Sequence, residues 1–227
     1  MVTRWWHATI ALAVLVGLVL QVVITVRAAG SPPGHAVGTL AGAPAVGRLV
    51  RVVSFFTVQS NVLCLIVSAQ LVRDPQRDGS VWRAVRLAAL VGITVTGIVY
   101  STVLARIHEP HGWEQVLNNA LFHYVTPAMA VLGWWMFGPR PRIDARTLRR
   151  AALWPLAWVA YTLVHGEVSG WYPYPFVDAA THGYGRVVVN LLGVLAVFAL
   201  VAFLFLLGDR RGFLHRAPAE AGPAATP

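Results

Sequence analysis

The chain has 227 residues, of which 57% are hydrophobic and only 12% are charged, and its mean hydropathy is +0.62. This composition excludes a soluble enzyme with a single anchor and predicts an integral membrane protein built as one compact helical bundle. The net charge of +9 does not require a nucleic-acid partner, because all eighteen basic residues are arginines and most of them flank apolar runs. With Cys64 as the single cysteine, an internal disulfide and a cysteine-based metal motif are both excluded.

The apolar runs predict an all-α, polytopic bundle of six transmembrane helices, since a helix that crosses a bilayer needs about 20 apolar residues. A cleaved signal peptide is the alternative for the first run, but its apolar core is long and no clear cleavage site follows. We predict one membrane domain over 1–211, a mobile loop over 28–47 and a disordered tail over 212–227. The six predicted spans cover about 5–26, 49–72, 85–107, 119–137, 151–165 and 187–207.

The arginines predict the orientation of this bundle. Thirteen of the eighteen lie near the chain termini and in the loops around 73–86 and 140–150, and five lie on the opposite side. Arginine accumulates on the cytoplasmic side of membrane proteins. Both termini are therefore expected in the cytoplasm, which agrees with an even number of spans, and the protein is expected in the cell membrane.

The second span carries an unusual stripe of small and polar residues, namely Ser54, Thr57, Asn61, Cys64 and Ser68. Steps of three and four residues place all five on one face of a helix. Polar groups in hydrocarbon are costly unless they face protein or a wet cavity, so this stripe should face inward. Interhelical packing is the simpler interpretation of such a stripe.

The depth of the polar groups favours a cavity over scattered packing contacts. With a rise of about 1.5 Å per residue, at least one polar group from every span lies within a few turns of the outer surface. The inner halves of the first, fifth and sixth spans have almost none. The residues counted in this layer are Gln21, Thr57, Tyr100, Ser101, His123, Thr162 and Asn190.

Thr57 and His123 are the candidate catalytic residues in such a cavity. A hydroxyl attacks an acyl carbonyl only when a base takes its proton, and histidine titrates in the useful range. A packed, hydrogen-bonded histidine without catalytic function is the alternative. Candidate substrate-binding, oxyanion-stabilising or orienting residues are Ser54, Ser60, Asn61, Tyr100, Ser101, Asn119 and Asn190.

Two loops on the outer side have their own interpretations. The segment 108–114 holds two histidines and two glutamates, with His182 as a possible neighbour, but Pro110 prevents a regular turn and the histidines follow no zinc-binding spacing. We expect solvated loop residues there, with no metal and no other cofactor. The aromatic run 171–176 predicts an interfacial cap, or a lid over the cavity.

Three short motifs stand out, namely Phe56-Thr57 followed by Gln59-Ser60-Asn61, the pattern Asn-x-x-x-His-x-x-x-Pro over 119–127, and Gly170-Trp171-Tyr172-Pro173. They resemble segments of the androgen-induced and androgen-dependent TFPI-regulating proteins, and the bacterial six-helix membrane relatives of these proteins look closer still. The animal proteins are membrane threonine hydrolases that cleave fatty-acid esters of hydroxy fatty acids. The resemblance implies Thr57 as the nucleophile and His123 as the general base.

Two functions follow from the sequence. The first is a lipid-ester hydrolase that uses Thr57 and His123 in an outer-leaflet cavity, with membrane lipids and a lipid ester as partners and no nucleic acid. The second is a non-catalytic protein that binds or transports a lipid or small molecule in the same cavity. Broken helices or inverted repeats would favour transport, and the sequence contains no evident internal repeat.

Overall fold

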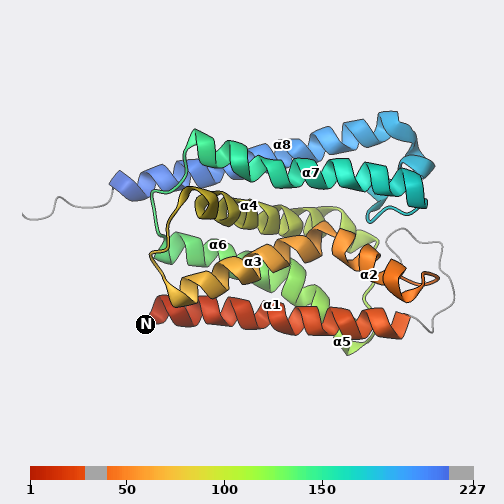
Figure 1. Cartoon of the computed structure of the whole chain (residues 1–227), viewed down its shortest axis with the longest axis horizontal. Helices are drawn as coiled ribbons and strands as arrows, with labels where there is room; N and C mark the ends of the chain where they lie inside the picture. The colour runs from red at the N-terminus through yellow and green to blue at the C-terminus, as the bar shows by residue number, and fades with distance from the viewer. Residues whose placement is uncertain (29–39, 215–227) are drawn as a thin grey trace, which may run out of the picture.

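The computed structural model describes residues 1–28 and 40–214, with only the backbone for 211–214, and this part of the chain is helical without strands. Figure 1 shows the helices lying side by side along one long axis. The elements are α1 (Val2–Arg27), α2 (Ala45–Ser54), α3 (Phe56–Arg73), α4 (Ser80–Thr102), the short 3₁₀ turn η2 (Leu104–Arg106), α5 (Gly112–Ala120), the π-helical turn η3 (Leu121–Val125), α6 (Thr126–Phe137), α7 (Ala145–Ser169), the 3₁₀ turn η4 (Pro175–Val177) and α8 (Ala179–Leu214).

Five segments in the described residues are long and apolar enough to cross a membrane. Five of the six predicted spans therefore overlap a helical segment of sufficient length and apolar character, and the predicted count of six is not reached. The exception is α7, which has 25 residues but also contains Pro155, His165 and Glu167 among its tryptophans, and these lower its mean hydropathy. The five segments are Val2–Arg27, Phe56–Arg73, Ser80–Arg106, Gly112–Phe137 and Ala179–Arg210.

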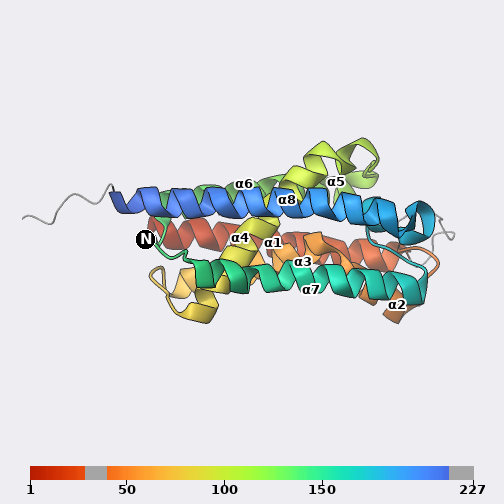
Figure 2. The same ribbon diagram turned by 90° about the horizontal axis from the view of Figure 1, so that it is seen from above.

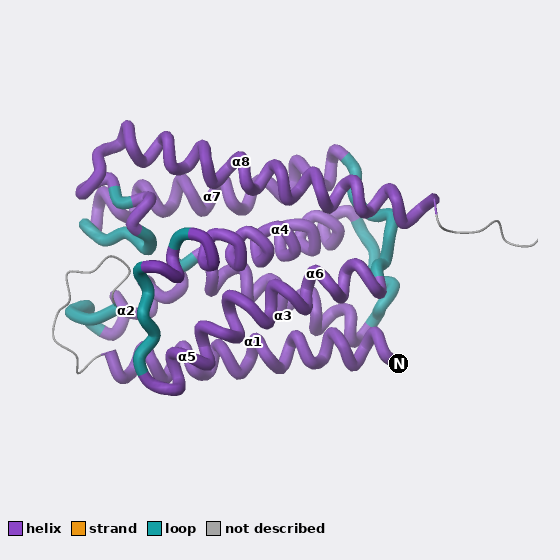
Figure 3. Tube along the Cα trace, turned by 180° about the vertical axis from the view of Figure 1, so that it is seen from behind, coloured by secondary structure: helices purple, strands orange, loops and turns teal. Residues whose placement is uncertain are grey.

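Helix α4 is the centre of the bundle, since it packs against α3, α6, α7 and α8, while α1 packs against α3, α5 and α6. Figure 2 shows from above that α1, α7 and α8 run along the long axis, whereas α4 is inclined to it. The N-terminus and the C-terminal part of α8 lie at one end (Figure 1), and α2, α5 and the C-terminal part of α1 lie at the other (Figure 3). We call the second the far end.

The second predicted span is not one helix, because the chain breaks at Phe55 between α2 and α3. Phe55 has an extended conformation, with φ −65° and ψ 125°, and its carbonyl accepts the first hydrogen bond of α3 from the Gln59 N–H at 3.2 Å. Thr57 is consequently the second residue of a new helix. The N–H groups in the first turn of a helix have no carbonyl partner within that helix, so they are free to bind other groups.

The remaining boundaries differ from the prediction at the ends of the chain. Helix α8 continues to Leu214, beyond the predicted boundary at 211, and is interrupted at Gly183 with φ 73°. The rest of the predicted tail, 215–227, lies outside the described residues, as does 29–39 of the predicted loop. Within that loop, α2 already begins at Ala45.

Buried charges fasten the connection between α6 and α7 at the end that holds the termini. The Asp209 carboxylate is fully buried and accepts the backbone N–H groups of Arg142 and Ile143 at 2.7 and 2.8 Å. The Arg86 guanidinium donates to the carbonyls of Gly138 and Pro139. A buried charge is tolerated when it is hydrogen-bonded, and here both charges tie α4 and α8 to this connection.

Candidate functional site

Thr57 and His123 lie close together at the far end of the bundle. The Thr57 Oγ1 atom is 3.4 Å from His123 Nε2, although the two residues are 66 positions apart in the chain. Thr57 comes from the first turn of α3, and His123 lies in the π-helical turn between α5 and α6. Such π-turns are frequent at functional sites, and here the turn presents the imidazole to the hydroxyl.

Two contacts fix the orientation of the His123 ring. Its Nδ1 atom is 3.2 Å from the Asn119 carbonyl, which can only accept, so Nδ1 carries the proton and donates. The Tyr100 ring stacks on the imidazole with 3.8 Å between the ring centroids. With Nδ1 protonated, Nε2 has the free lone pair that accepts the Thr57 hydroxyl proton.

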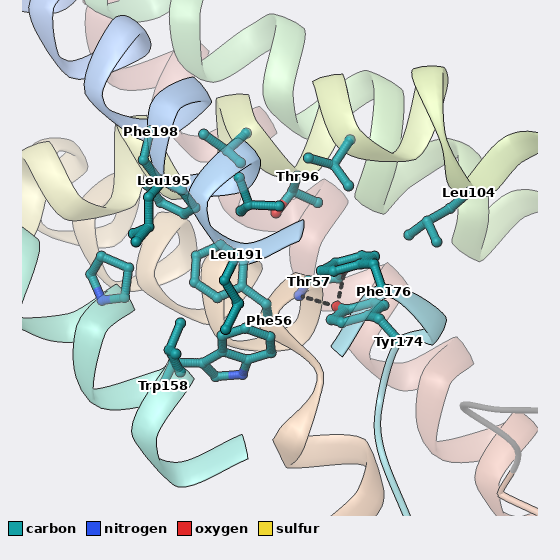
Figure 4. A pocket seen from close by; sticks show the side chains of 15 residues that line it. Phe56, Thr57, Thr96, Leu104, Trp158, Tyr174, Phe176, Leu191, Leu195 and Phe198 are labelled. Carbon is teal, nitrogen blue, oxygen red and sulfur yellow. Dashed lines mark hydrogen bonds between the residues drawn. The ribbon is translucent and has the colours of Figure 1, made fainter. Parts of the chain in front are cut away.

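Tyr174 is the third polar group at this point, and the sequence analysis did not single it out. Its hydroxyl accepts the Thr57 N–H at 3.1 Å and lies 3.2 Å from Thr57 Oγ1 (Figure 4). Burial raises the pKa of Tyr174, so the phenol stays protonated at neutral pH and keeps a proton to donate. The aromatic run 171–176 indicated a cap or lid, but no pattern in it distinguishes Tyr174 from Tyr172.

The loop that carries Tyr174 is held by close packing against α7. The Tyr172 ring lies directly against Gly166, where a side chain would collide with the ring. Tyr174 is buried in one aromatic cluster with Phe56 and Trp158, and its ring stacks on that of Phe176. The loop is thus fixed at both ends of its aromatic run, which places the Tyr174 hydroxyl accurately.

A wide cavity of about 590 Å³ opens beside this group. Its walls come from α1, α3, α4, α5, η3 and the loop before η4, all at the far end. Amide side chains are among its lining residues, including Gln21, Gln115 and Asn119. We call it the wide cavity; Thr57, His123, Tyr100 and Tyr174 all line it. A cavity of this size is in the usual range for small-molecule sites.

A second, narrow cavity of about 50 Å³ begins at the other side of Thr57. Figure 4 shows it between α3, α4, α7 and α8, with Thr57 and Tyr174 on one side and Leu195 and Phe198 on the other. We call it the apolar slot, because nearly all of its lining is aliphatic or aromatic. Thr57, Tyr174 and Leu104 line both cavities, and His123 lines only the wide one.

Three of the predicted orienting residues are buried in helix contacts and line neither cavity. Ser54 bonds to the Val50 carbonyl and to the Tyr161 hydroxyl, both at 2.7 Å. Ser60 donates to the Phe56 carbonyl at 2.8 Å. Asn61 donates to the carbonyls of Thr57 at 2.9 Å and of Phe122 at 3.4 Å, so it fastens α3 to the π-turn beside His123.

The other predicted residues divide between the site and its surroundings. Tyr100 and Asn119 both contact His123 and line the wide cavity. Ser101 is exposed and lines neither cavity. Asn190 donates to the Phe176 carbonyl at 3.0 Å, which fastens η4 to α8.

The segment 108–114 contacts neighbouring helices. Glu114 forms an ion pair with Arg27, and the Tyr100 hydroxyl is 2.9 Å from His108 Nδ1. Burial, with a smaller contribution from His111, lowers the pKa of His108, so this imidazole is neutral at pH 7. No group of three or more metal-ligating side chains occurs within 1–28 and 40–210.

The arrangement unites a hydroxyl, an imidazole in the accepting tautomer and a phenol that can donate. Three hydrogen-bonding groups of this kind are the elements of nucleophilic acyl transfer. They meet where the wide cavity, with its mixed polar and apolar lining, adjoins the apolar slot. No protein-family model, no curated protein and no solved structure matches this chain.

Proposed function

We propose that this protein is an integral membrane lipid-ester hydrolase in which Thr57 is the nucleophile and His123 the general base. The observation that carries the proposal is the 3.4 Å separation of Thr57 Oγ1 and His123 Nε2, with His123 Nδ1 committed to the Asn119 carbonyl. A nucleophile within reach of a base that a third group orients is the signature of covalent catalysis. The substrates are fatty-acid esters of hydroxy fatty acids or similar lipid esters.

The reaction proceeds in two halves. Thr57 Oγ1 attacks the ester carbonyl while its proton passes to His123 Nε2, and the ester C–O bond breaks as His123 returns this proton to the departing alkoxide. The acyl group is then bound to Thr57. A water molecule gives its proton to His123 and attacks the acyl carbon, and Thr57 recovers its proton as the fatty acid leaves.

Two features favour the negative charge that develops on the carbonyl oxygen. The Tyr174 hydroxyl adjoins Thr57 Oγ1 and remains protonated, so it can donate to this oxygen, and the site lies at the first turn of α3, which is the positive end of the helix dipole. The break at Phe55 is what creates this helix terminus next to the nucleophile.

The segments that resemble the membrane threonine hydrolases support the same proposal. Phe56–Asn61 contains Thr57, and Asn119–Pro127 contains His123 with the carbonyl that orients it. The Gly170–Pro173 segment leads directly to Tyr174. Three motifs that are far apart in the chain thus adjoin one site.

We expect a lipid-like fluorophosphonate to label Thr57. The wild-type protein, purified in detergent, should form one covalent adduct that peptide mass spectrometry locates at Thr57, and Thr57→Ala should abolish it. Ser101→Ala, which removes an exposed hydroxyl outside the site, should be labelled like the wild type. An adduct on another residue, or none at all, would count against Thr57 as the nucleophile.

A non-catalytic protein that binds or transports lipid remains the second candidate, and the broken helix at Phe55 favours it. Interrupted helices with free termini are common at the binding sites of transporters. Such a protein would bind a fluorescent fatty acid in the wide cavity without consuming an ester. The absence of labelling together with saturable binding would select this function.

The proposal includes a topology with six spans, in which α7 crosses the membrane beside α8 and both termini are cytoplasmic. The shared location of the N-terminus and the C-terminal part of α8 supports it, as does the arginine-rich start of α7 (Figure 1). A reporter fused after Pro227 should be active only in its cytoplasmic form, and one inserted near Gly34 only in its exported form. If the exported form of the reporter were active after Pro227, the site would face the cytoplasm and the proposed orientation would be wrong.

A further inference from the structure

We infer that the apolar slot receives the acyl chain of the ester, and that the wide cavity receives the alcohol part and releases it. The inference rests on the proposed function and adds the orientation of the substrate. It also identifies Leu195 as a residue that sets the acyl-chain length.

The position of the base determines which cavity holds the leaving alcohol. His123 must return a proton to the alkoxide, so the alkoxide has to depart on the side that His123 lines. His123 lines the wide cavity and not the apolar slot. The acyl chain stays bound to Thr57. Because the alcohol occupies the wide cavity, the acyl chain lies in the slot on the other side of Thr57.

The lining of the slot matches a hydrocarbon chain. Leu191, Val194, Leu195 and Phe198 lie at steps of three and four residues, so α8 presents one apolar face over about 10 Å. The polar groups on the walls are satisfied elsewhere: Trp158 Nε1 donates to the Ser54 carbonyl at 2.9 Å, and Thr96 Oγ1 donates to Ser60 Oγ at 3.3 Å. Away from Thr57 and Tyr174, the slot therefore offers only apolar contact. Burial of an alkyl chain in such surroundings is favourable.

The test compares two leucines on α8. Leu195 lines the slot, whereas Leu192 is 61% exposed on the outside of the same helix. For each variant, kcat/KM is measured with the p-nitrophenyl esters of butyrate, octanoate and palmitate. Leu195→Trp should lower the palmitate-to-butyrate ratio, by about fourfold for each methylene that the indole excludes. Leu192→Trp should leave the ratio unchanged.

Leu195→Ala provides an opposite change if the tryptophan variant does not fold. A wider slot should move the preferred ester toward longer chains. Equal effects of Leu195→Trp on all three esters, or an equal shift of the ratio in Leu192→Trp, would overturn the assignment.

A binding experiment separates failure of the slot from failure of the hydrolase proposal. A diazirine analogue of palmitate is cross-linked to the wild type and to Thr57→Ala, and the modified peptides are identified by mass spectrometry. Cross-links to the slot residues of α7 and α8, competed by unlabelled palmitate and lost in Leu195→Trp, support the slot even without ester hydrolysis. Cross-links confined to the wide cavity, in a protein that does hydrolyse esters, would refute the slot and leave the hydrolase intact.

Discussion

Replacing Thr57 by alanine is expected to lower the hydrolysis of lipid esters by a factor on the order of 10⁴ or more, because Thr57 supplies the hydroxyl that lies against His123 Nε2. His123→Ala removes the base and should have a comparable effect. Since the two residues act as one unit, the double variant should be barely worse than either single variant. Initial rates with a purified protein in detergent measure all three.

The controls separate catalysis from folding. Thr57→Ser keeps the hydroxyl and should retain part of the activity, since it loses only a methyl group and the rotamer restriction of threonine. Thr57→Ala should cost only about 1 kcal/mol of stability, because the Tyr174 hydroxyl keeps its bond to the backbone N–H of residue 57. If the polar stripe served packing alone, the alanine variant would melt early and the wild type would show no hydrolysis.

Tyr174→Phe is expected to reduce kcat by about 10² to 10³, the usual cost of losing one oxyanion donor. The phenylalanine ring retains the packing in the aromatic cluster of Phe56 and Trp158, so the loop should stay in place. KM should change little, because the lost hydrogen bond forms mainly in the transition state. Steady-state kinetics on one ester give both constants.

The matched control is Tyr184→Phe, which also removes a phenol that hydrogen-bonds, here to Glu167 on the protein surface. Its kinetics should equal those of the wild type. If Tyr174→Phe instead raised KM at constant kcat, Tyr174 would position the substrate and would not stabilise the transition state.

The proximity of Thr57 and His123 was predictable because depth along a helix follows directly from the residue count. The same count gives no direction around the helix axis, which is why Tyr100 and Ser101 were equal candidates. In the structure Tyr100 stacks on His123, and Ser101, about 100° further around the helix, is exposed. The direction in which a residue points around the helix axis depends on how the helices pack, and this packing cannot be read from a single sequence.

The break at Phe55 could not be predicted, since no glycine or proline marks it and both flanking segments have helical composition. Its consequence is large, because it divides the polar stripe. Thr57 starts a new helix and faces the cavities, whereas Ser54 ends the preceding helix and faces Tyr161. Tyr174 was missed for a related reason: its partner Thr57 is 117 residues away, and only the tertiary fold brings the loop over the first turn of α3.

The most direct test of the account measures ester hydrolysis and thermal stability on the same preparations of the wild type and Thr57→Ala. We expect the wild type to release fatty acid, and the variant to melt at nearly the same temperature with its turnover lost. Wild-type turnover by a well-folded Thr57→Ala protein would contradict the account, because the hydroxyl beside His123 would then have no part in the reaction.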